Sequence, residues 1–273
     1  MKGHTIMIKT PPITSMENAF SVKGKNVVVT GGNRGIGFGI ATAFAQSGAN
    51  VVILCRNIES GEAAAAQLSQ YGGRFAAFRC DISDIESVKA AAEQVFAFYD
   101  HVDVLINNAG VGTRQEFLTD ENMSEFHRIV GTNLFGVTNV IHTIAPKMRD
   151  SGLGGSIINI SSVGGQRVSN TRDHHNSPYN ISKAGVDIFT RYLAIDLGDY
   201  GIRVNAIAPG PTHSDLDADL PPSFLEQIEN ELPTHRFGEA IEIGALAVYL
   251  SSPAANQITG CVYAHDGGLL CIN

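Results

Sequence analysis

Short apolar runs alternate with longer segments of helical character along most of the chain. The run Val27–Val29 consists of three β-branched residues, which is typical of a strand buried on both faces. Comparable apolar runs predict further strands at 50–54, 75–78, 102–106, 156–160, 203–207 and 261–264. The segments between them predict helices at 38–46, in the alanine-rich stretch that follows 57, from 83 to 99, at roughly 123–148, 179–197 and 240–250, and a short one from 223.

This alternation predicts a doubly wound, Rossmann-type parallel sheet of about seven strands with helices on both faces. Signals at the ends of elements agree with it. Gly72 and Gly73 would end the second helix, and Ser83 with Glu86 would form a capping box at the start of the third.

No linker, repeat or low-complexity segment divides the chain. We therefore expect a single domain over 20–273, preceded by an N-terminal arm over 1–19. The arm holds Lys2, Lys9 and two prolines but no continuous apolar core of a signal peptide.

Composition narrows the class of protein further. Of the 273 residues, 44% are hydrophobic and 17% are charged, which suits a globular chain with a substantial core. The formal charge of −8 gives no electrostatic reason to expect nucleic acid or an anionic membrane surface as a partner. No apolar run approaches the roughly 18 residues that a membrane-spanning helix needs, so we expect no membrane association.

The four cysteines lie far apart, and no Cys-x-x-Cys pair occurs. This spacing predicts neither a disulfide framework nor a zinc site, and it favours a reducing, cytoplasmic location. The run Asp173-His174-His175 raises the question of a metal. No further ligand stands at a familiar spacing, so we interpret it as part of a loop and expect no metal.

The stretch that follows Val27–Val29 carries the first chemical signal. Thr30 leads into Gly31, Gly32, Gly35 and Gly37, and a helical segment begins directly afterwards. A strand that turns through glycines into a helix points free backbone N–H groups, and the positive end of the helix dipole, at one place. Because glycine has no Cβ, a phosphate can come close. The turn therefore predicts dinucleotide binding, although its spacing is Gly-x-x-x-Gly-x-Gly and not the familiar Gly-x-Gly-x-x-Gly.

Tyr179 and Lys183 stand four residues apart at the start of a predicted helix, so their side chains share one face. A phenol titrates near pH ~10, and a nearby cation lowers its pKa toward the range useful for acid–base catalysis. Taken alone, the pair is more simply interpreted as two surface residues. Ser162, however, ends the fifth predicted strand, where ligands collect in open α/β sheets.

Asn133 and the run Asn107–Gly110 add to these motifs. In this order, with the glycine turn, Ser162, Tyr179-x-x-x-Lys183 and Pro209-Gly210, they resemble the short-chain dehydrogenase/reductase family over about 20–268. The spacing of the glycines also fits this family better than its longer, epimerase-like relatives.

The resemblance implies a role for each matching residue. Tyr179 would be the general acid in carbonyl reduction and the base in alcohol oxidation. Lys183 would bind the nicotinamide ribose and lower the pKa of Tyr179. Ser162 would hold the substrate oxygen, and Asn133 would seat a water that connects Lys183 to solvent. The remaining cofactor contacts would come from Gly31, Asn33, Arg34, Gly35, Ile36, Gly37, Arg56, Asn57, Asp81, Ile82, Asn108, Ala109, Gly110, Pro209, Gly210 and Thr212.

The end of the second predicted strand favours NADP(H) as the cofactor. NAD enzymes of this type place a carboxylate there, which hydrogen-bonds the ribose hydroxyls and repels a 2′-phosphate. Here the position is Cys55, followed by Arg56, and the glycine turn contributes Arg34. Two cations suit a dianionic phosphate, although both arginines could also simply face water.

The expected reaction is hydride transfer between nicotinamide and a small-molecule carbonyl or secondary alcohol. The interval from Ser162 to Tyr179 is longer than in many relatives, and the stretch 164–178 is polar. With the N-terminal arm, this weakly resembles the subgroup of sorbose reductases, mannitol dehydrogenases and carbonyl reductases, and it favours a ketose or polyol. Hydroxysteroid or 3-oxoacyl substrates remain open, as does a regulatory NADP-binding protein without catalysis. The resemblance further implies a homotetramer or homodimer, with the helices around 123–148 and 179–197 at an interface.

Overall fold

Seven parallel strands form one sheet in the order β3-β2-β1-β4-β5-β6-β7. The computed structural model describes residues 8, 12–112, 116–168, 176–213 and 221–272. The strand order reverses between β1 and β4, which creates the switch point where ligands bind in open α/β sheets. The strands are β1 (Asn26–Thr30), β2 (Asn50–Cys55), β3 (Phe75–Arg79), β4 (Val104–Asn107), β5 (Gly155–Ile160), β6 (Ile202–Pro209) and β7 (Val262–His265).

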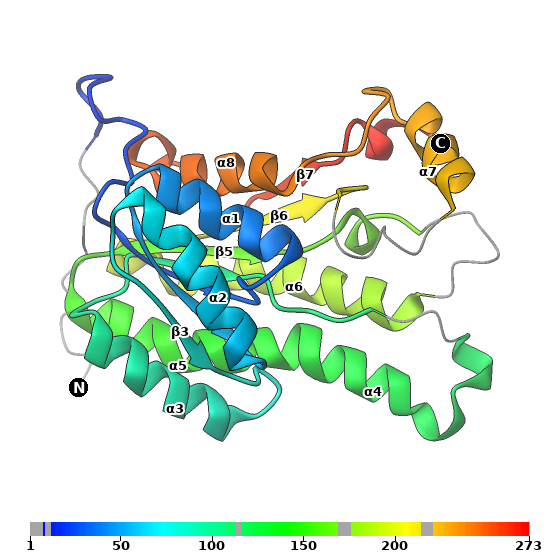
Figure 1. The fold of residues 1–273 in the computed structure, drawn as a ribbon, viewed down its shortest axis with the longest axis horizontal. Coiled ribbons are helices and arrows are strands. Elements are labelled where there is room, and N and C mark those ends of the chain that lie inside the picture. The colour runs from blue at the N-terminus through cyan, green and yellow to red at the C-terminus, as the bar shows by residue number, and fades with distance from the viewer. Residues whose placement is uncertain (1–7, 9–11, 113–115, 169–175, 214–220, 273) are drawn as a thin grey trace.

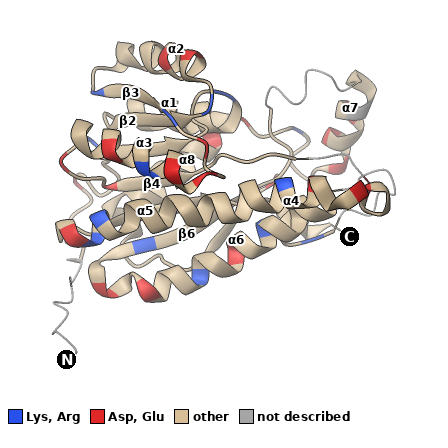
Figure 2. Ribbon diagram, turned by 90° about the horizontal axis from the view of Figure 1, so that it is seen from below, with Lys and Arg blue, Asp and Glu red and all other residues tan. Residues whose placement is uncertain are grey.

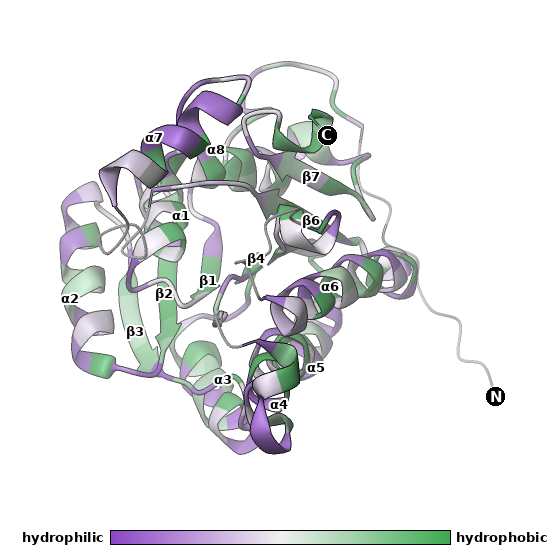
Figure 3. Ribbon diagram, turned by 90° about the vertical axis from the view of Figure 1, so that its right-hand side faces the viewer, coloured by the Kyte–Doolittle hydropathy of each residue, from purple (hydrophilic) through white to green (hydrophobic). Residues whose placement is uncertain are grey.

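Helices cover both faces of this sheet (Figures 1 and 3). One layer consists of α1 (Gly35–Gln46), α2 (Ile58–Leu68) and α8 (Ala240–Ser251), which pack on the face that carries Val27 and Val29. The other consists of α3 (Ile85–Phe98), α5 (Gly136–Ser151) and α6 (Ser177–Asp196), on the face that carries Val28. Two layers of helices leave no exposed face on the central strands, and this explains why β1 is apolar at successive positions. The predicted fold class is confirmed.

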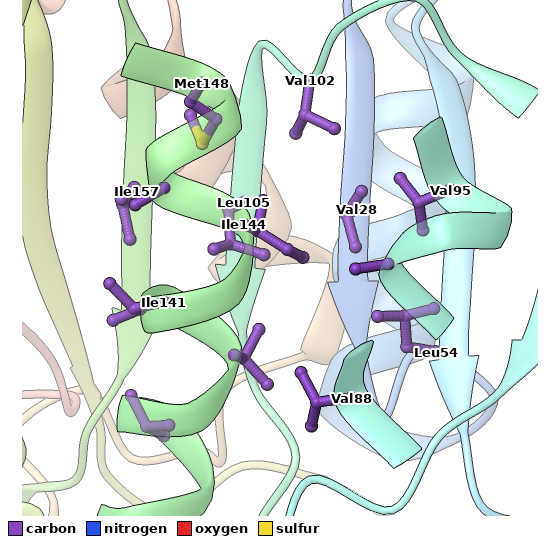
Figure 4. Packing of buried hydrophobic residues seen from close by; sticks show 14 of the residues in the cluster. Val28, Leu54, Val88, Val95, Val102, Leu105, Ile141, Ile144, Met148 and Ile157 are labelled. Carbon is purple, nitrogen blue, oxygen red and sulfur yellow. The ribbon is translucent and has the colours of Figure 1, made fainter. Parts of the chain in front are cut away.

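The core between the sheet and the second helix layer is built from branched aliphatic side chains. Val28 and Leu105 on the sheet meet Val88 of α3 and Ile144 of α5, and all four are fully buried (Figure 4). Charged residues lie outside this core, and Figure 2 shows both signs interspersed along the outer surfaces of α5 and α6. Within the described ranges, no helix combines the length and apolar content needed to cross a bilayer.

The helical stretch expected at roughly 123–148 is confirmed. It consists of α4 (Ser124–Val130), a π-helical turn η4 (Gly131–Phe135) and α5, and the π-turn was not predicted. One local prediction was wrong. The capping box predicted at Ser83 is absent, because the Asp81 carboxylate binds both the Ser83 backbone N–H and its hydroxyl. Asp84 is the N-cap of α3 instead, and its side chain accepts a hydrogen bond from the Glu86 N–H.

Other boundaries follow the expected ranges closely. The helix α6 begins at Ser177, two residues before the predicted start, with Pro178 in its first turn. A short helix α7 (Pro222–Glu231) lies near the C-terminal segment (Figure 1). Separation of an arm over 1–19 from a domain over 20–273 stays a prediction, although Ala19 is buried and its carbonyl accepts a hydrogen bond from the Ala254 N–H.

Candidate active site

The glycine turn follows β1 and leads directly into α1. Gly31 and Gly35 have φ values of +64° and +51°, in the left-handed region that favours glycine. At Gly37 the constraint is close approach, because an added Cβ would lie 2.1 Å from the Gly31 carbonyl oxygen. The backbone of the turn is therefore packed against itself at the positive end of α1, which is the geometry of a phosphate-binding turn.

A clamp of hydrogen bonds joins this turn to the end of β4. The Thr30 hydroxyl oxygen accepts hydrogen bonds from the Asn108 and Ala109 N–H groups, both at 3.0 Å. In return, the Asn108 side-chain amide donates to the carbonyl oxygens of Thr30 and Gly31 at 3.0 and 3.2 Å. The clamp fixes β1 and β4 relative to one another at the switch point. Thr30 is part of the sequence motif, but its role as the acceptor in this clamp was not anticipated.

A cavity of about 730 Å³ opens above this clamp. Its volume lies in the range of small-molecule and cofactor sites. The structure brings most of the predicted cofactor residues together here. The cavity is also lined by residues that were not predicted as cofactor contacts, namely Leu54, Cys55, Ser60, Cys80, Val111, Gly112, Arg128 and Thr132. The predicted residues that line it are Gly31, Asn33, Arg34, Gly35, Ile36, Gly37, Arg56, Asn57, Asp81, Ile82, Asn108, Ala109 and Gly110.

The side of the cavity formed by β2 and α2 carries positive charge and no acid at the end of β2. Cys55 ends that strand, and Arg34 and Arg56 line the cavity beside it. The pKa of Asp81 is lowered, first by its hydrogen bond from Ser83 and to a smaller extent by Arg56. Asn57 accepts a hydrogen bond from the Ser60 N–H as the N-cap of α2. Arg34 and Arg56 fit a phosphate ester, and Cys55 stands at the end of β2 in place of a carboxylate that would repel it.

Tyr179 and Lys183 lie on the first turns of α6, next to the end of β5. Lys183 is 4% exposed, and its Nζ donates a 2.7 Å hydrogen bond to the Ile160 carbonyl oxygen. Nζ lies 5.5 Å from the centre of the Tyr179 ring, and the Tyr179 hydroxyl forms a hydrogen bond with the Ser162 side chain. The three side chains therefore form one cluster at the carboxyl ends of the strands. An added Cβ at Gly110 would lie 3.6 Å from Lys183 Nζ, so the cluster adjoins the cavity.

Burial shifts the pKa of both titratable groups in this cluster. It raises the pKa of the Tyr179 phenol, and the Ser162 hydrogen bond opposes that shift. For Lys183, burial lowers the pKa to about 8, and the carboxylate of Asp187 acts in the opposite direction. The phenol alone is thus a weak acid–base group, while the lysine titrates near physiological pH.

Asn133 lies in the π-helical turn η4 and is fully buried. Its side-chain oxygen accepts from the Val111 N–H at 2.8 Å, and its amide donates to the Val111 carbonyl oxygen at 2.8 Å. The same amide donates to the Ser182 hydroxyl at 3.3 Å, and Ser182 donates to the Tyr179 carbonyl oxygen. Asn133 therefore joins the segment after β4 to the turn that carries Tyr179. A π-turn is common at functional sites, but its position is not visible in the apolar pattern.

A buried acid lies behind Lys183 on the same helix. Asp187 is 7% exposed, and its carboxylate shares a hydrogen bond with the Ser161 side chain. Burial raises its pKa, while Ser161, Arg191 and Lys183 act to lower it. This residue was not predicted. An aspartate four residues after the lysine, on a face with Val186 and Thr190, is the signal that could have identified it.

Pro209 ends β6, and Gly210 and Thr212 follow it, at the opposite side of the switch point. The Gly210 N–H donates to the His265 carbonyl oxygen, and an added Cβ would lie 2.7 Å from Asp266 Cα. Thr212 is buried and donates to the Gly210 carbonyl oxygen at 3.0 Å. Unlike the residues described above, these three do not line the 730 Å³ cavity. No cluster of metal-ligating side chains occurs in the described part of the chain, and Asp173-His174-His175 lie outside it.

The fold and this site define a dinucleotide-binding α/β protein. Residues 31–270 match the family profile described as enoyl-(acyl carrier protein) reductase. The chain belongs to the short-chain dehydrogenase/reductase family, and it is an oxidoreductase for CH–OH and C=O groups.

Individual relatives act on quite different molecules. The chain is 39% identical to the 3-oxoacyl-(acyl-carrier-protein) reductase FabG of Chlamydia trachomatis over 90% of its length and 97% of that protein. It is 34% identical to the 7alpha-hydroxysteroid dehydrogenase of Escherichia coli, over 90% of this chain and 94% of that one. The solved structure of L-sorbose reductase from Gluconobacter frateurii, complexed with NADPH and L-sorbose, is similar with a TM-score of 0.85 and 28% identity. That match covers 93% of this chain and 100% of that one.

Proposed function

We propose that this protein is an NADP(H)-dependent reductase or dehydrogenase that transfers a hydride between nicotinamide and the carbon of a ketone or secondary alcohol. The cluster of Ser162, Tyr179 and Lys183 beside the cavity carries this proposal, because it places a proton donor where a carbonyl oxygen would lie. When bound, the nicotinamide supplies or accepts the hydride. Side chains of this protein transfer the proton and bind the substrate oxygen.

The proposed roles follow from the contacts of each group. Tyr179 donates its proton to the substrate oxygen in reduction and takes it back in oxidation, and Ser162 holds that oxygen through its hydroxyl. Lys183, fixed by Ile160, holds positive charge beside the phenol and favours the phenolate, against the effect of burial. Asn133 would hold a water between Lys183 and solvent. Its hydrogen bonds to Val111 give it a fixed orientation for this task.

NADP(H) is the proposed cofactor, in preference to NAD(H). The support is the pair Arg34 and Arg56 at the cavity, together with a thiol where a carboxylate would repel a 2′-phosphate. The similar L-sorbose reductase was solved with NADPH, in keeping with this choice. Asp81 and Ile82 would flank the adenine, and Pro209, Gly210 and Thr212 would line the nicotinamide.

An oxygen-rich substrate, such as a ketose or polyol, is the proposed substrate class. The stretch 164–178 begins beside Ser162 and ends beside Tyr179, and its sequence is rich in hydrogen-bonding side chains. An apolar ketone would leave such groups unpaired, at a desolvation cost of ~1–3 kcal/mol each. The L-sorbose complex favours the same class. The FabG and hydroxysteroid relatives favour 3-oxoacyl or steroid ketones as the alternative.

A homotetramer or homodimer that uses α6 is part of the proposal. Ile181, Ile188, Tyr192 and Ile195 are half or more exposed along α6, and Phe135 of η4 is 60% exposed. The spacing of the four α6 residues places them on one side of the helix, where an apolar surface of this kind suits a second copy. Light scattering on the purified protein measures the assembly directly.

A substrate panel tests the proposed function. Purified protein is assayed for oxidation of NADPH and of NADH with ketoses, a 3-oxoacyl thioester and a steroid ketone. We expect turnover with NADPH and the highest kcat/KM for a ketose. If a steroid or acyl ketone gives a higher kcat/KM than every ketose, the proposed substrate class is wrong. No turnover with any ketone, together with tight NADPH binding, would favour a non-catalytic regulatory protein.

A further inference from the structure

Arg167 binds the C-terminal segment of the chain, which follows it by about a hundred residues. Its Nη1 donates hydrogen bonds to the Leu269 carbonyl oxygen at 2.5 Å and to the Ile272 carbonyl oxygen at 2.9 Å. Arg167 belongs to the polar stretch 164–178, whose sequence favours a ketose or polyol as the substrate. In the structure, its guanidinium holds the turn η8 (Leu269–Cys271) and the residue that follows it.

Through its backbone, Arg167 is connected to the catalytic cluster of Ser162, Tyr179 and Lys183. The Arg167 N–H donates to the Val163 carbonyl oxygen at 2.9 Å, within the turn η5 (Val163–Gly165) that follows Ser162. An added Cβ at Gly165 would lie 2.9 Å from the backbone of Lys183, so this turn is in close contact with α6. Arg167 is therefore hydrogen-bonded to the turn that follows Ser162 and packs on Lys183.

The C-terminal segment that Arg167 binds also contacts Gly210, one of the residues predicted to line the nicotinamide. Asp266 packs against Gly210, and its carboxylate accepts from the Gly268 N–H at 3.0 Å and the Leu270 N–H at 2.8 Å. The Gly267 carbonyl oxygen accepts from the Thr234 N–H, which joins the segment to the residues after α7. Figure 1 shows the red C-terminal turn beside α7 at the end of the sheet to which β6 points.

We propose that Arg167 is a positioning residue that sets substrate affinity by latching the C-terminal segment 266–272 against the Ser162 side of the site. The latch closes a ring of contacts from Ser162 through Arg167 and Asp266 to Gly210, around the place where the substrate would bind. The proposal rests on the proposed function of this site. Because Arg167 bonds carbonyl oxygens of the backbone and not the reacting groups, its effect falls on the shape of the pocket.

A double-mutant cycle tests the latch. The variants are Arg167→Ala, a truncation that removes residues 269–273, and the two combined. Each single change removes the two hydrogen bonds from Arg167 to the C-terminal segment, so each should raise KM for the carbonyl substrate by at least about tenfold. The combined variant should be no worse than the poorer single one. We expect kcat and the NADPH dissociation constant to change by less than about twofold.

Two further variants separate the latch from a general loss of stability. Arg167→Lys keeps a cationic donor and should recover part of the affinity, whereas an unrelated structural defect would not respond to the charge. Arg149→Ala removes an arginine that pairs with Asp150 at the end of α5, and it should leave KM unchanged. Unchanged KM in Arg167→Ala, or additive effects in the cycle, would overturn the proposal.

Amide hydrogen exchange tests the latch without a measurement of enzyme activity. The Leu270 and Cys271 N–H groups are both hydrogen-bonded, to Asp266 and to Gly268. Their exchange should accelerate in Arg167→Ala and not in Arg149→Ala. A wild-type protein that reduces no carbonyl would refute the proposed function while this measurement still reports on the latch, and equal exchange in both variants would refute the latch itself.

Discussion

The ammonium group of Lys183 is held by the carbonyl oxygen of Ile160, at a distance of 2.7 Å, in a position that is almost closed to solvent. Burying a cation is unfavourable, and this is the reason why its pKa falls to about 8. The buried charge of Lys183 therefore lowers the stability of the folded protein. This cost decreases as the pH rises above about 8 and the folded lysine loses its proton.

Replacing Lys183 with methionine should stabilise the protein at pH 7. The folded-state pKa of about 8 lies below the ordinary value of 10.5, so below about pH 8 the folded protein bears the full cost of a buried charge. The shift corresponds to ~3 kcal/mol, and the Ile160 carbonyl left unpaired offsets ~1–3 kcal/mol of it. We expect a net gain of up to about 2 kcal/mol in the free energy of unfolding, measured by urea titration.

The pH dependence of this stability difference tests whether the buried charge of Lys183 is its cause. Between about pH 8 and 10.5 the folded wild-type lysine loses its proton while the unfolded one keeps it, so wild-type stability rises and the difference from the variant should shrink. A difference that stays constant over this range would show that burial of charge is not the source. The variant should also lose turnover.

Removing the Tyr179 hydroxyl should abolish most turnover and leave cofactor binding intact. Tyr179→Phe keeps the ring beside Lys183 but removes the proposed proton donor, so kcat should fall by ~10²–10⁴. Ser162→Ala removes its hydrogen-bond partner and should act in the same direction. Tyr192→Phe is the matched control, because Tyr192 lies exposed on the same helix. Near-normal turnover by Tyr179→Phe would rule out this proton donor.

Exchanging charge at the end of β2 should move cofactor preference toward NADH. The double change Cys55→Asp with Arg56→Ala adds a repulsive carboxylate and removes a phosphate partner at the same place in the cavity. The ratio of kcat/KM for NADPH to that for NADH should fall by at least about tenfold. Cys261→Asp, which adds the same charge at an exposed cysteine, should leave the ratio unchanged. Wild-type protein that already prefers NADH would contradict the proposed role of Arg34 and Arg56.

A single methyl group at Gly37 should weaken the glycine turn. The Cβ of Gly37→Ala would lie 2.1 Å from the Gly31 carbonyl oxygen and 2.4 Å from the Asn108 side chain, so the turn must move. Overpacking of this kind costs about 1–3 kcal/mol, and we expect thermal unfolding to shift downward and NADPH to stabilise the variant less. Gly198→Ala is the control, because nothing lies within 4 Å of its Cβ. Equal NADPH stabilisation in the two variants would argue against cofactor binding at this turn.

Much of the fold was predictable because its signals are local. The strands are runs of apolar residues that two helix layers bury, and β1 and β5 lie where the hydrophobic pattern placed them. The cap of α3 was mispredicted because Ser83 and Asp84 are both good N-caps, and the choice depended on the Asp81 carboxylate. The π-turn at Gly131–Phe135 was missed because it lies inside one continuous helical stretch, between α4 and α5.

The order of strands and helices, the glycine turn and the spacing of Tyr179 and Lys183 can be predicted from the sequence, because each depends on residues within a few positions of one another. Three contacts become visible only in the folded chain: Lys183 with Ile160, Asn133 with Val111, and Arg167 with the C-terminal turn. These contacts join segments that lie far apart in the chain. The pairing of the strands and the packing of α6 bring them together, and no local pattern of residue types contains that information.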